Sequence, residues 1–312
     1  LTNFDLEKMV DTTDEWIRSR TGIEKRHLVG EGEATSDMCT MIAKQLLEKS
    51  GKAPEEIDLI LIATSTPDYM VVSTAALVQD KIGAINAWGY DIVAACTGFV
   101  YAMETGSKLV ESGQYKNAMV IGADTMSSII DYTDRNTCVI FGDGGGGVLL
   151  EPSKDETGIL DSILHVDGSG SKYLTVPAGG SLHPASKDTV DKKMHYVYQD
   201  GKTVFKFAVK NMADVSKRIL DRNQLTGDDI KLFIPHQANQ RIIDAAAKRC
   251  GLADEKVFIN INRYGNTTAG TIPIALDEAV ESKRLKKDDI LLLAAFGGGF
   301  TWGSMLIQWS NK

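Results

Sequence analysis

The segment DLILIA at residues 58–63 is apolar without interruption after Asp58, and it follows a helical pattern that spans residues 35–50. A helix that leads through a short polar link into such a run is typical of a buried strand in an α/β protein. The same helix-to-strand pattern recurs later in the chain, where a helical pattern over residues 205–222 leads into the segment IKLFI at residues 230–234. The repetition predicts two similar α/β units.

The repeat continues beyond these two strands. In the first unit the pattern predicts a strand that ends at Ala95, a helix over residues 98–111 and a strand over residues 118–123. In the second unit it predicts, in the same order, an extended segment, a helix and a strand over residues 257–261, 272–282 and 290–295.

The spacing between corresponding positions is nearly constant. It is 172 residues between the two apolar strands quoted first, and 170 residues from Cys96 to Asn266. A fixed offset of this kind indicates a duplicated unit. We therefore divide the chain into an N-terminal half at residues 1–156 and a C-terminal half at residues 157–312.

The alternation of strands and helices predicts an α/β fold with parallel or mixed sheets covered by helices. Ligands of such sheets gather at the carboxyl ends of the strands. Two halves related by pseudo-symmetry would turn these ends toward each other, so we expect Cys96 and Asn266 to converge. The Gly- and Ser-rich stretch over residues 165–200 interrupts the second half and is expected to cover the site as loops or a hairpin.

Composition limits the kinds of partner. The chain has 312 residues, with 34 Lys and Arg against 42 Asp and Glu and a net charge of −8, which argues against a surface that coats nucleic acid. Its longest apolar run, residues 290–296, is far shorter than the roughly 20 residues that cross a bilayer. The charged opening is not a signal peptide. We expect a cytoplasmic protein that binds neither nucleic acid nor membrane.

Cysteine and histidine spacing gives no sign of a structural metal or a disulfide framework. The four cysteines lie far apart without a C-x-x-C motif, and the five histidines show no paired ligand spacing. We therefore predict free thiols and no metal site. Because the chain opens in a segment that is predicted to be helical, we also expect a strand upstream of Leu1.

Cys96 is the first candidate for chemistry. It follows the apolar run that ends at Ala95, and it lies at the start of the helix that is predicted from about Gly98. A thiol at that corner meets free backbone N–H groups and the positive end of the helix dipole, which favour the thiolate and so favour nucleophilic attack. The alternative is that a small buried cysteine merely packs, and position alone leaves both interpretations open.

Two further polar residues lie at corresponding corners of the second half. His236 directly follows the strand at residues 230–234, and Asn266 lies in a turn before the next helix. Each could instead cap the helix that follows it. Their combination with Cys96 favours a shared site.

Two glycine-rich segments have different interpretations. The run FGGGF at residues 296–300 ends the last strand, where its backbone N–H groups could stabilise an oxyanion. The run GDGGGG at residues 142–147 lacks the Lys-Ser/Thr pair of a phosphate-binding loop, so we interpret it as a tight connection between strands.

Taken together, these motifs resemble the 3-ketoacyl-acyl carrier protein synthase III family of bacterial fatty acid synthesis, within the thiolase-like superfamily. The resemblance covers nearly the whole chain. The motifs that carry it are DEWI at 14–17, RTGI at 20–23, AAC at 94–96, DR at 134–135, FGDG at 141–144, PHQAN at 235–239, GNT at 265–267 and AFGGGFTWG at 295–303. The resemblance implies a layered α-β-α-β-α thiolase-like fold.

The resemblance also implies a reaction. Cys96 matches the nucleophile that takes an acyl group from acyl-CoA, while His236 and Asn266 match the residues that bind the thioester carbonyl of malonyl-acyl carrier protein as carbon dioxide leaves. The backbone N–H groups of Cys96 and Gly298 match the oxyanion hole. No permanently bound cofactor is implied, since the CoA thioester is a substrate.

Further residues match the family's binding sites. For CoA, these are Trp16 and Arg135, which would sandwich the adenine, with Thr12, Arg20 and Asn239. For acyl carrier protein, they are Gln237, Arg241, Lys248 and Arg249. The alternatives are a tryptophan that packs on the core and a basic face that is merely solvated.

Val71 stands where some members of the family carry an aromatic residue that narrows the acyl pocket, often across the interface of a homodimer. Its smaller side chain would leave room for longer or branched primers.

Two other functions remain as alternatives at this stage: a non-decarboxylating acyltransferase on the same scaffold, and a non-catalytic module that binds acyl carrier protein.

Overall fold

The computed structural model describes residues 1–155 and 157–310. Its first sheet is four-stranded, in the order β2-β1-β3-β4. β1 and β3 are parallel neighbours, β2 is parallel to β1, and β4 is antiparallel to β3. The bounds are β1 (Leu59–Ala63), β2 (Trp88–Ile92), β3 (Ala118–Asp124) and β4 (Gly144–Leu150).

The second sheet is also four-stranded and has the order β5-β10-β9-β8. β8 and β9 are parallel, and β10 runs antiparallel to both β9 and β5. A separate pair of short strands, β6 and β7, is antiparallel. The bounds are β5 (Gly158–Val166), β6 (Leu174–Thr175), β7 (Tyr198–Gln199), β8 (Leu232–Pro235), β9 (Ile290–Gly297) and β10 (Thr301–Gln308).

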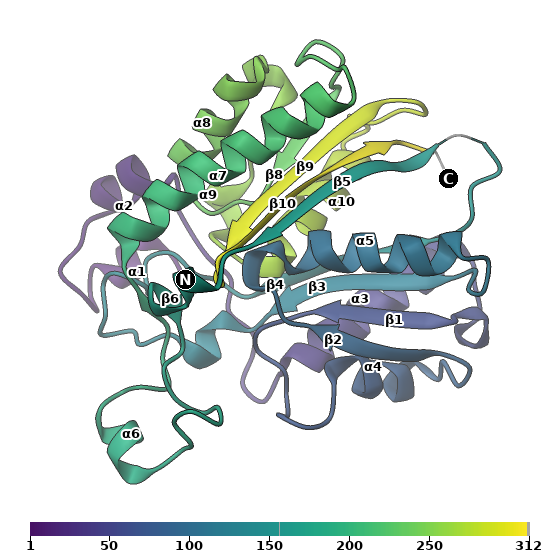
Figure 1. The fold of residues 1–312 in the computed structure, drawn as a ribbon. Helices are drawn as coiled ribbons and strands as arrows, with labels where there is room; N and C mark the ends of the chain where they lie inside the picture. The colour runs from purple at the N-terminus through teal and green to yellow at the C-terminus, as the bar shows by residue number, and fades with distance from the viewer. Residues whose placement is uncertain (156, 311–312) are drawn as a thin grey trace.

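Helices or 3-10 turns occupy most of the connections between these strands (Figure 1). The α-helices are α1 (Asn3–Leu6), α2 (Asp14–Thr21), α3 (Thr35–Ser50), α4 (Thr74–Ile82), α5 (Gly98–Glu111), α6 (Lys187–Asp191), α7 (Gly201–Arg222), α8 (Gln240–Cys250), α9 (Ile261–Tyr264) and α10 (Thr271–Glu281). The short 3-10 turns are η1 (Pro54–Glu56), η2 (Ala95–Thr97), η3 (Met126–Ile129), η4 (Gly168–Lys172), η5 (Asp254–Lys256) and η6 (Thr268–Gly270). None of the described helices is long and apolar enough to cross a membrane.

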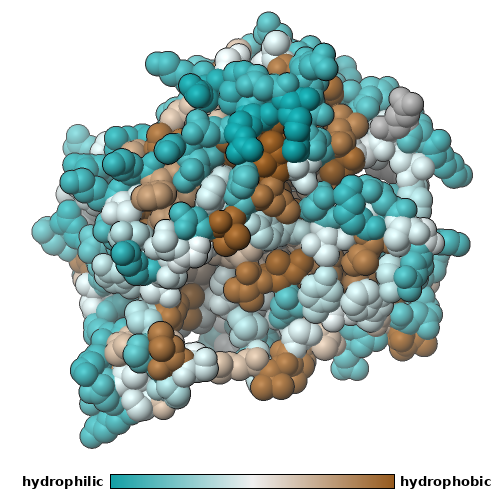
Figure 2. Space-filling view, in the orientation of Figure 1, coloured by the Kyte–Doolittle hydropathy of each residue, from teal (hydrophilic) through white to brown (hydrophobic). Residues whose placement is uncertain are grey.

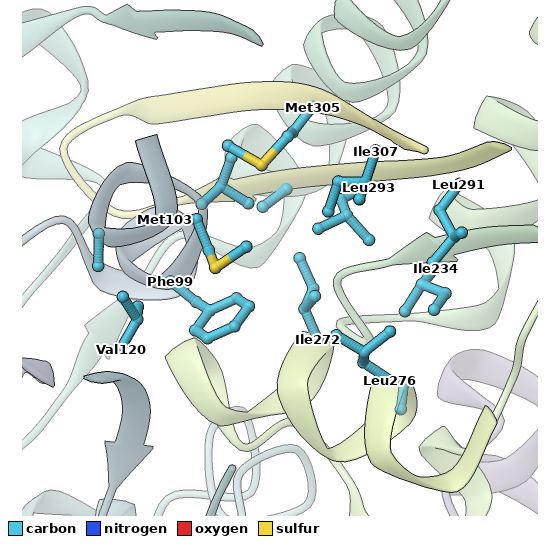
Figure 3. Close-up of a cluster of buried hydrophobic side chains, with 14 of the residues drawn as sticks. Phe99, Met103, Val120, Ile234, Ile272, Leu276, Leu291, Leu293, Met305 and Ile307 are labelled. Carbon is cyan, nitrogen blue, oxygen red and sulfur yellow. The ribbon is translucent and has the colours of Figure 1, made fainter. Parts of the chain in front are cut away.

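The largest apolar cluster lies between the two sheets. Figure 3 shows Phe99 and Met103 of α5 and Ile272 and Leu276 of α10 pointing into one volume, together with side chains from strands of both sheets. α5 and α10 therefore form a shared middle layer. The predicted α-β-α-β-α layering is confirmed.

Side-chain alternation along β1 explains why its sequence is apolar without interruption. Leu59 and Leu61 belong to the central cluster, whereas Ile60 and Ile62 pack with α3 and α4 on the outer face. Both faces of the strand are thus covered by helices, as expected of a parallel strand in an α/β sheet. The second sheet has the same arrangement, with α7 and α8 on its outer face.

Corresponding elements of the two halves begin at a different offset from the one that the site residues suggested. η2 and η6 begin at Ala95 and Thr268, α5 and α10 begin at Gly98 and Thr271, and both offsets are 173 residues. Ala95 and Thr268 also share an unusual positive φ, of 47° and 51°. The structural counterpart of Cys96 is consequently Ala269, and the predicted equivalence of Cys96 with Asn266 is wrong.

Three predictions about individual elements also need correction. The strand before Cys96 ends at Ile92 rather than at Ala95. The extended segment at 257–261 contributes a single bridge from Val257 to Phe233, because the chain turns into α9 at Ile261. The glycine run that we interpreted as a connection begins β4 itself. A Cβ on Gly145 would lie 2.5 Å from the Cβ of Ala123, so close packing requires glycine there despite its low strand propensity.

The long excursion within the second half, over residues 165–200, divides into two parts. β6 and β7 pair near the body of the protein, and Leu174 and Gln199 from this pair line the central cavity. The part that carries α6 stands away from the body (Figure 1). The expected cover of the site is therefore confirmed for the β6–β7 pair.

The division of the chain at residues 156/157 stays a prediction, and residue 156 lies outside the described residues.

Replacing Phe99 by Ala should test the middle layer. Phe99 is fully buried in the central cluster, so Phe99→Ala is expected to lower the free energy of unfolding by about 3–5 kcal/mol in denaturant titrations. Met41 on α3 is exposed, and Met41→Ala should change that free energy by no more than about 0.5 kcal/mol. Similar losses for the two variants would contradict the assigned core.

Candidate active site

Cys96, His236 and Asn266 line one cavity of about 340 Å³ between the two halves. Cys96 comes from η2, His236 follows β8, and Asn266 precedes η6. The structure thus brings together the three residues that the sequence selected. Trp16 and Asn239 line the same cavity, as do Phe205 of α7 and Gly297 at the end of β9.

The corner that carries Cys96 is fixed by contacts with the last two strands of the chain. The hydroxyl of Thr301 donates a hydrogen bond of 2.9 Å to the carbonyl oxygen of Ala94. A Cβ on Gly297 would lie 2.7 Å from the backbone nitrogen of Cys96, so only glycine permits this approach. Cys96 is consequently held with 6% of its surface exposed.

The protonation state of Cys96 differs from the sequence-based expectation. Burial, followed by the nearby carboxylate of Asp124, raises the pKa of the Cys96 thiol to about 12, although the backbone N–H of Cys96 acts in the opposite direction. Desolvation of the anion thus outweighs the stabilisation expected at a helix N-terminus. The resting group is a thiol, so any attack by the sulfur requires removal of its proton.

His236 is fixed on one side and open on the other. Its backbone N–H donates to the carbonyl oxygen of Ala294 at 2.7 Å, and its Nδ1 lies 2.6 Å from the hydroxyl oxygen of Thr271. Its Nε2 is buried and has no hydrogen-bond partner among the described residues. Burial lowers the pKa of His236 to about 3, so the ring is neutral at physiological pH.

Asn266 is oriented by its own turn. Its backbone N–H donates to the carbonyl oxygen of Ile140 at 3.0 Å, and its carbonyl oxygen accepts from the N–H of Gly142 at 3.0 Å. The side-chain Oδ1 accepts a hydrogen bond of 2.9 Å from the backbone N–H of Thr268. Because Oδ1 is occupied, the Nδ2 donors remain for a ligand in the cavity that Asn266 lines.

Asp124 connects the two halves beside the site and was missed by sequence reasoning. It is fully buried at the end of β3, and its Oδ1 accepts hydrogen bonds from the backbone N–H of Ser65 and the hydroxyls of Thr64 and Thr66. Its Oδ2 accepts from the hydroxyl of Thr268 and, at 3.3 Å, from the N–H of Ala269. Asp124 therefore holds η6 in place. The sequence signal that could have identified Asp124 is a carboxylate at the end of an otherwise apolar strand.

The predicted nucleotide-binding residues gather at the mouth of the cavity. The guanidinium of Arg135 lies 4.7 Å from the centroid of the Trp16 ring, and that of Arg20 lies 5.5 Å from it. Arg135 is anchored by a 2.7 Å hydrogen bond to the carbonyl oxygen of Asp11. Thr12 is close in sequence but does not line the cavity, and its buried hydroxyl has no partner among the described residues.

Asn239 has a defined structural role as well as a place in the cavity. It is the N-cap of α8, where its Oδ1 accepts a hydrogen bond from the backbone N–H of Arg241 at 3.0 Å. Its Nδ2 donates to the carbonyl oxygen of Arg20 at 2.9 Å. Asn239 thus joins the segment after His236 to the helix that carries Trp16.

One predicted site residue does not lie where the resemblance implied. Gln237 is buried, and its side-chain amide bonds the backbone of Pro235, Phe258, Asn260 and Ile261. It cannot belong to a surface that binds acyl carrier protein, because all its polar atoms serve the interior. Val71 is 95% exposed and does not line the cavity of its own chain.

The remaining predicted basic residues are on the surface of α8. Arg241, Lys248 and Arg249 are all exposed. Arg241 stacks over the ring of Phe205 at 4.8 Å, and Arg249 pairs with Asp214 at 3.6 Å.

Sequence reasoning missed the cations on α7, the helix that packs against α8. They are exposed at every fourth residue, and the first of them also lines the cavity: Lys202, Lys206 and Lys210. This spacing places them on one side of the helix and was the signal that could have found them.

Two duplicated α/β units that stack around a shared helix pair, with a buried cysteine between them, define the thiolase-like class of condensing enzymes. Comparison with known proteins narrows the class. A family model for 3-oxoacyl-[acyl-carrier-protein] synthase III matches residues 90–168, and the model for its C-terminal part matches residues 220–309. The chain belongs to the 3-oxoacyl-[acyl-carrier-protein] synthase III family, and is thus a condensing acyltransferase of fatty acid synthesis.

Individual relatives agree with this assignment along the whole chain. The beta-ketoacyl-[acyl-carrier-protein] synthase III of Koribacter versatilis is 55% identical over 312 residues, which cover 99% of this chain and 94% of that protein. The one from Chlorobium luteolum is 56% identical, with 99% and 95% covered. Among solved structures, the synthase III of Aquifex aeolicus has a TM-score of 0.91 and 43% identity, with 99% and 95% covered.

The low pKa of His236 predicts an acid-sensitive fold. The ring in the unfolded chain binds a proton below about pH 6.5, whereas the folded ring does so only near pH 3. Acidification between these values therefore favours the unfolded state, by up to about 1.4 kcal/mol per pH unit. We expect the free energy of unfolding, measured between about pH 4 and 6, to fall less steeply in His236→Asn than in the wild type. Parallel curves would contradict the neutral buried ring.

Proposed function

We propose that this cavity catalyses the initiating condensation with Cys96 as nucleophile and with His236 and Asn266 as hydrogen-bond donors to the second substrate. The observation that carries the proposal is the unpartnered Nε2 of His236, which is buried in the cavity that Cys96 and Asn266 also line. An unpaired polar atom in such a place costs free energy unless a ligand pairs with it. A thioester carbonyl oxygen is the acceptor that fits.

The first step is the transfer of the acyl group. The sulfur of Cys96 attacks the thioester carbon of acyl-CoA, a new carbon–sulfur bond forms, and the bond to the CoA sulfur breaks. CoA leaves as the thiol, so the proton of Cys96 passes to the leaving sulfur. Because the pKa of Cys96 is high, removal of this proton is an intrinsic part of the step.

The second step is a decarboxylative Claisen condensation. The carbon–carbon bond to the carboxylate of malonyl-acyl carrier protein breaks, carbon dioxide leaves, and the electron pair passes onto the thioester carbonyl as an enolate. The enolate carbon then attacks the acyl carbon on Cys96, and the Cys96 sulfur leaves and regains a proton. Hydrogen bonds from His236 and Asn266 stabilise the enolate more than the ground-state carbonyl, which is how donors accelerate such a step.

The oxyanion that forms during each attack on the acyl carbon needs its own donors. The β9–β10 turn lies against the corner that carries Cys96, with Gly297 in direct contact with the Cys96 backbone. Gly298 follows in this turn beside Ala95. We assign the backbone N–H groups of Cys96 and Gly298 to the oxyanion hole, because preorganised backbone donors next to the nucleophile suit that task.

Binding of CoA is assigned to the mouth of the cavity. Trp16 and Arg135 are already stacked there, and their planar groups could separate to receive an adenine between them. Arg20 adds positive charge for the phosphates, and Asn239 lies inside the cavity on the path of the pantetheine arm. Thr12 would flank the nucleotide outside the cavity.

Binding of acyl carrier protein is assigned to a basic surface of α7 and α8. We define it by the exposed cations Lys202, Lys206, Lys210, Arg241, Lys248 and Arg249. The chain as a whole has a net charge of −8, so a local cluster of cations beside the cavity is the feature that can attract an acidic partner. It replaces the assignment that included Gln237.

A homodimer is supported by the free edge of β2. β2 pairs only with β1 among the described residues, and large apolar side chains are exposed on β2 and the adjoining loops: Tyr69, Met70, Val71, Val72, Ile85, Trp88, Tyr90 and Val93. Figure 2 shows brown hydrophobic side chains at the lower edge of the face on which β2 lies. A patch of this kind marks an interaction surface. Pairing there would allow Val71 to reach the partner's acyl pocket, where its small side chain would admit primers longer than acetyl.

Changing Cys96 to Ser should abolish the acyl-enzyme. Mass spectrometry of intact protein mixed with acyl-CoA is expected to show one added acyl group in the wild type and none in Cys96→Ser. Cys250 is a buried cysteine on α8 that packs in the apolar cluster on the outer face of the second sheet. Cys250→Ala should therefore still be acylated. An acyl group retained on Cys96→Ser would place the nucleophile elsewhere.

Changing Asn266 to Ala should separate the two steps. We expect carbon dioxide release from malonyl-acyl carrier protein to slow about a hundredfold, the usual loss for one donor to a developing oxyanion. Acylation of Cys96 should remain within a few-fold of the wild-type rate, because Asn266 takes no part in it. Equal loss of both rates would mean that Asn266 is structural. In the wild type, transfer of the acyl group without any release of carbon dioxide from malonyl-acyl carrier protein would favour a simple acyltransferase.

A further inference from the structure

Thr271 is the buried residue that contacts the catalytic histidine most closely. It is the first residue of α10, and its hydroxyl oxygen lies 2.6 Å from Nδ1 of His236. The same hydroxyl lies 3.1 Å from the carbonyl oxygen of Thr268. A threonine hydroxyl has one proton to donate, so these two acceptors compete for it.

The other bonds of the turn favour Nδ1 as the acceptor. The carbonyl oxygen of Thr268 already accepts a hydrogen bond from the backbone N–H of Thr271, whereas the Thr271 hydroxyl is the only partner of Nδ1 of His236 among the described residues. The distance to Nδ1 is also the shorter by half an ångström. Donation to Nδ1 therefore satisfies both acceptors, while donation to Thr268 would require Nδ1 to carry the proton of the ring.

A neutral imidazole carries its proton on one nitrogen, and the hydrogen bond at the other nitrogen decides which. We propose that Thr271 is a positioning residue that donates to Nδ1 of His236, holds the ring in its Nε2–H tautomer and presents that N–H to the cavity. This inference rests on the proposed function, in which His236 donates to the malonyl thioester. With the other tautomer, Nε2 would offer a lone pair and would repel an enolate oxygen.

The same turn orients the second donor. The backbone N–H of Thr268 occupies Oδ1 of Asn266, and the hydroxyl of Thr271 occupies Nδ1 of His236. In each side chain the acceptor atom is thus bound within the η6–α10 segment, and the donor atom is left for the substrate. Thr271 consequently serves the condensation step rather than the acylation of Cys96.

The tautomer can be read directly in the full-length wild-type enzyme. Nitrogen-15 spectra of protein labelled at histidine distinguish the two tautomers, and His236→Asn identifies the signals of His236. We expect Nε2 to be protonated and Nδ1 to be unprotonated near neutral pH. An Nδ1–H tautomer would overturn the inference without any substitution at Thr271.

Two variants at Thr271 test the consequence for catalysis. Thr271→Val keeps the shape but removes the hydroxyl, and we expect roughly a tenfold loss in decarboxylation of malonyl-acyl carrier protein, equivalent to one hydrogen bond. Its loss should appear in kcat rather than in KM, with Cys96 acylation by acyl-CoA retained. Thr271→Ser keeps the hydroxyl and should restore both the tautomer and the rate.

The outcomes separate this inference from the function on which it rests. If Thr271→Val retains the Nε2–H tautomer and the wild-type decarboxylation rate, the role of Thr271 is overturned while that of His236 stands. If His236→Asn decarboxylates as fast as the wild type, the proposed function of His236 fails, whatever the tautomer. If Thr271→Val does not fold, the wild-type spectrum and the rate of Thr271→Ser still decide the question.

Discussion

The packing of α5 and α10 between the two sheets is the constraint on which the rest of the structure depends. The apolar cluster that joins them draws side chains from strands of both sheets, so neither half can move without disturbing the other. The turns η2 and η6 lead into α5 and α10, and because these two helices pack into one apolar cluster, the two turns contact each other. Cys96 lies in η2 and Asn266 directly precedes η6. The packing of α5 and α10 in the middle layer therefore brings these two residues to the same cavity.

The polarity of the site changes from the interior to the surface. In the interior, the thiol and the imidazole are both neutral because burial opposes either charge, and the buried carboxylate of Asp124 beside them is surrounded by hydrogen-bond donors. At the mouth, Arg20 and Arg135 lie against Trp16. Such a gradient suits a substrate with a neutral thioester at one end and an anionic nucleotide or carrier protein at the other.

The sequence predicted those features that depend on local pattern. The buried strand β1 and the helix α5 have the predicted extents to within a residue, because an apolar run and a clear helical period each determine their own element. Cys96, His236 and Asn266 were selected because each lies at the end of such an element. The duplication itself was visible for the same reason.

Features that depend on contacts between distant segments were not predictable. Gln237 has the polarity of a surface residue, and only the fold shows that its amide bonds four buried backbone groups. The glycines of β4 have low strand propensity, and their place in the sheet follows from the close approach of neighbouring segments. Likewise, nothing local distinguishes Thr271 from any threonine at the start of a helix until His236 lies beside it.

The burial of Cys96 has a consequence for the durability of the enzyme. Hydrogen peroxide oxidises thiolates rather than thiols, and accessible sulfurs faster than hidden ones. A thiol that is kept protonated and almost wholly covered is therefore expected to resist sulfenic acid formation. In the proposed role of Cys96 as nucleophile, the cover that makes removal of its proton necessary at each turnover also protects the sulfur from oxidative damage between turnovers.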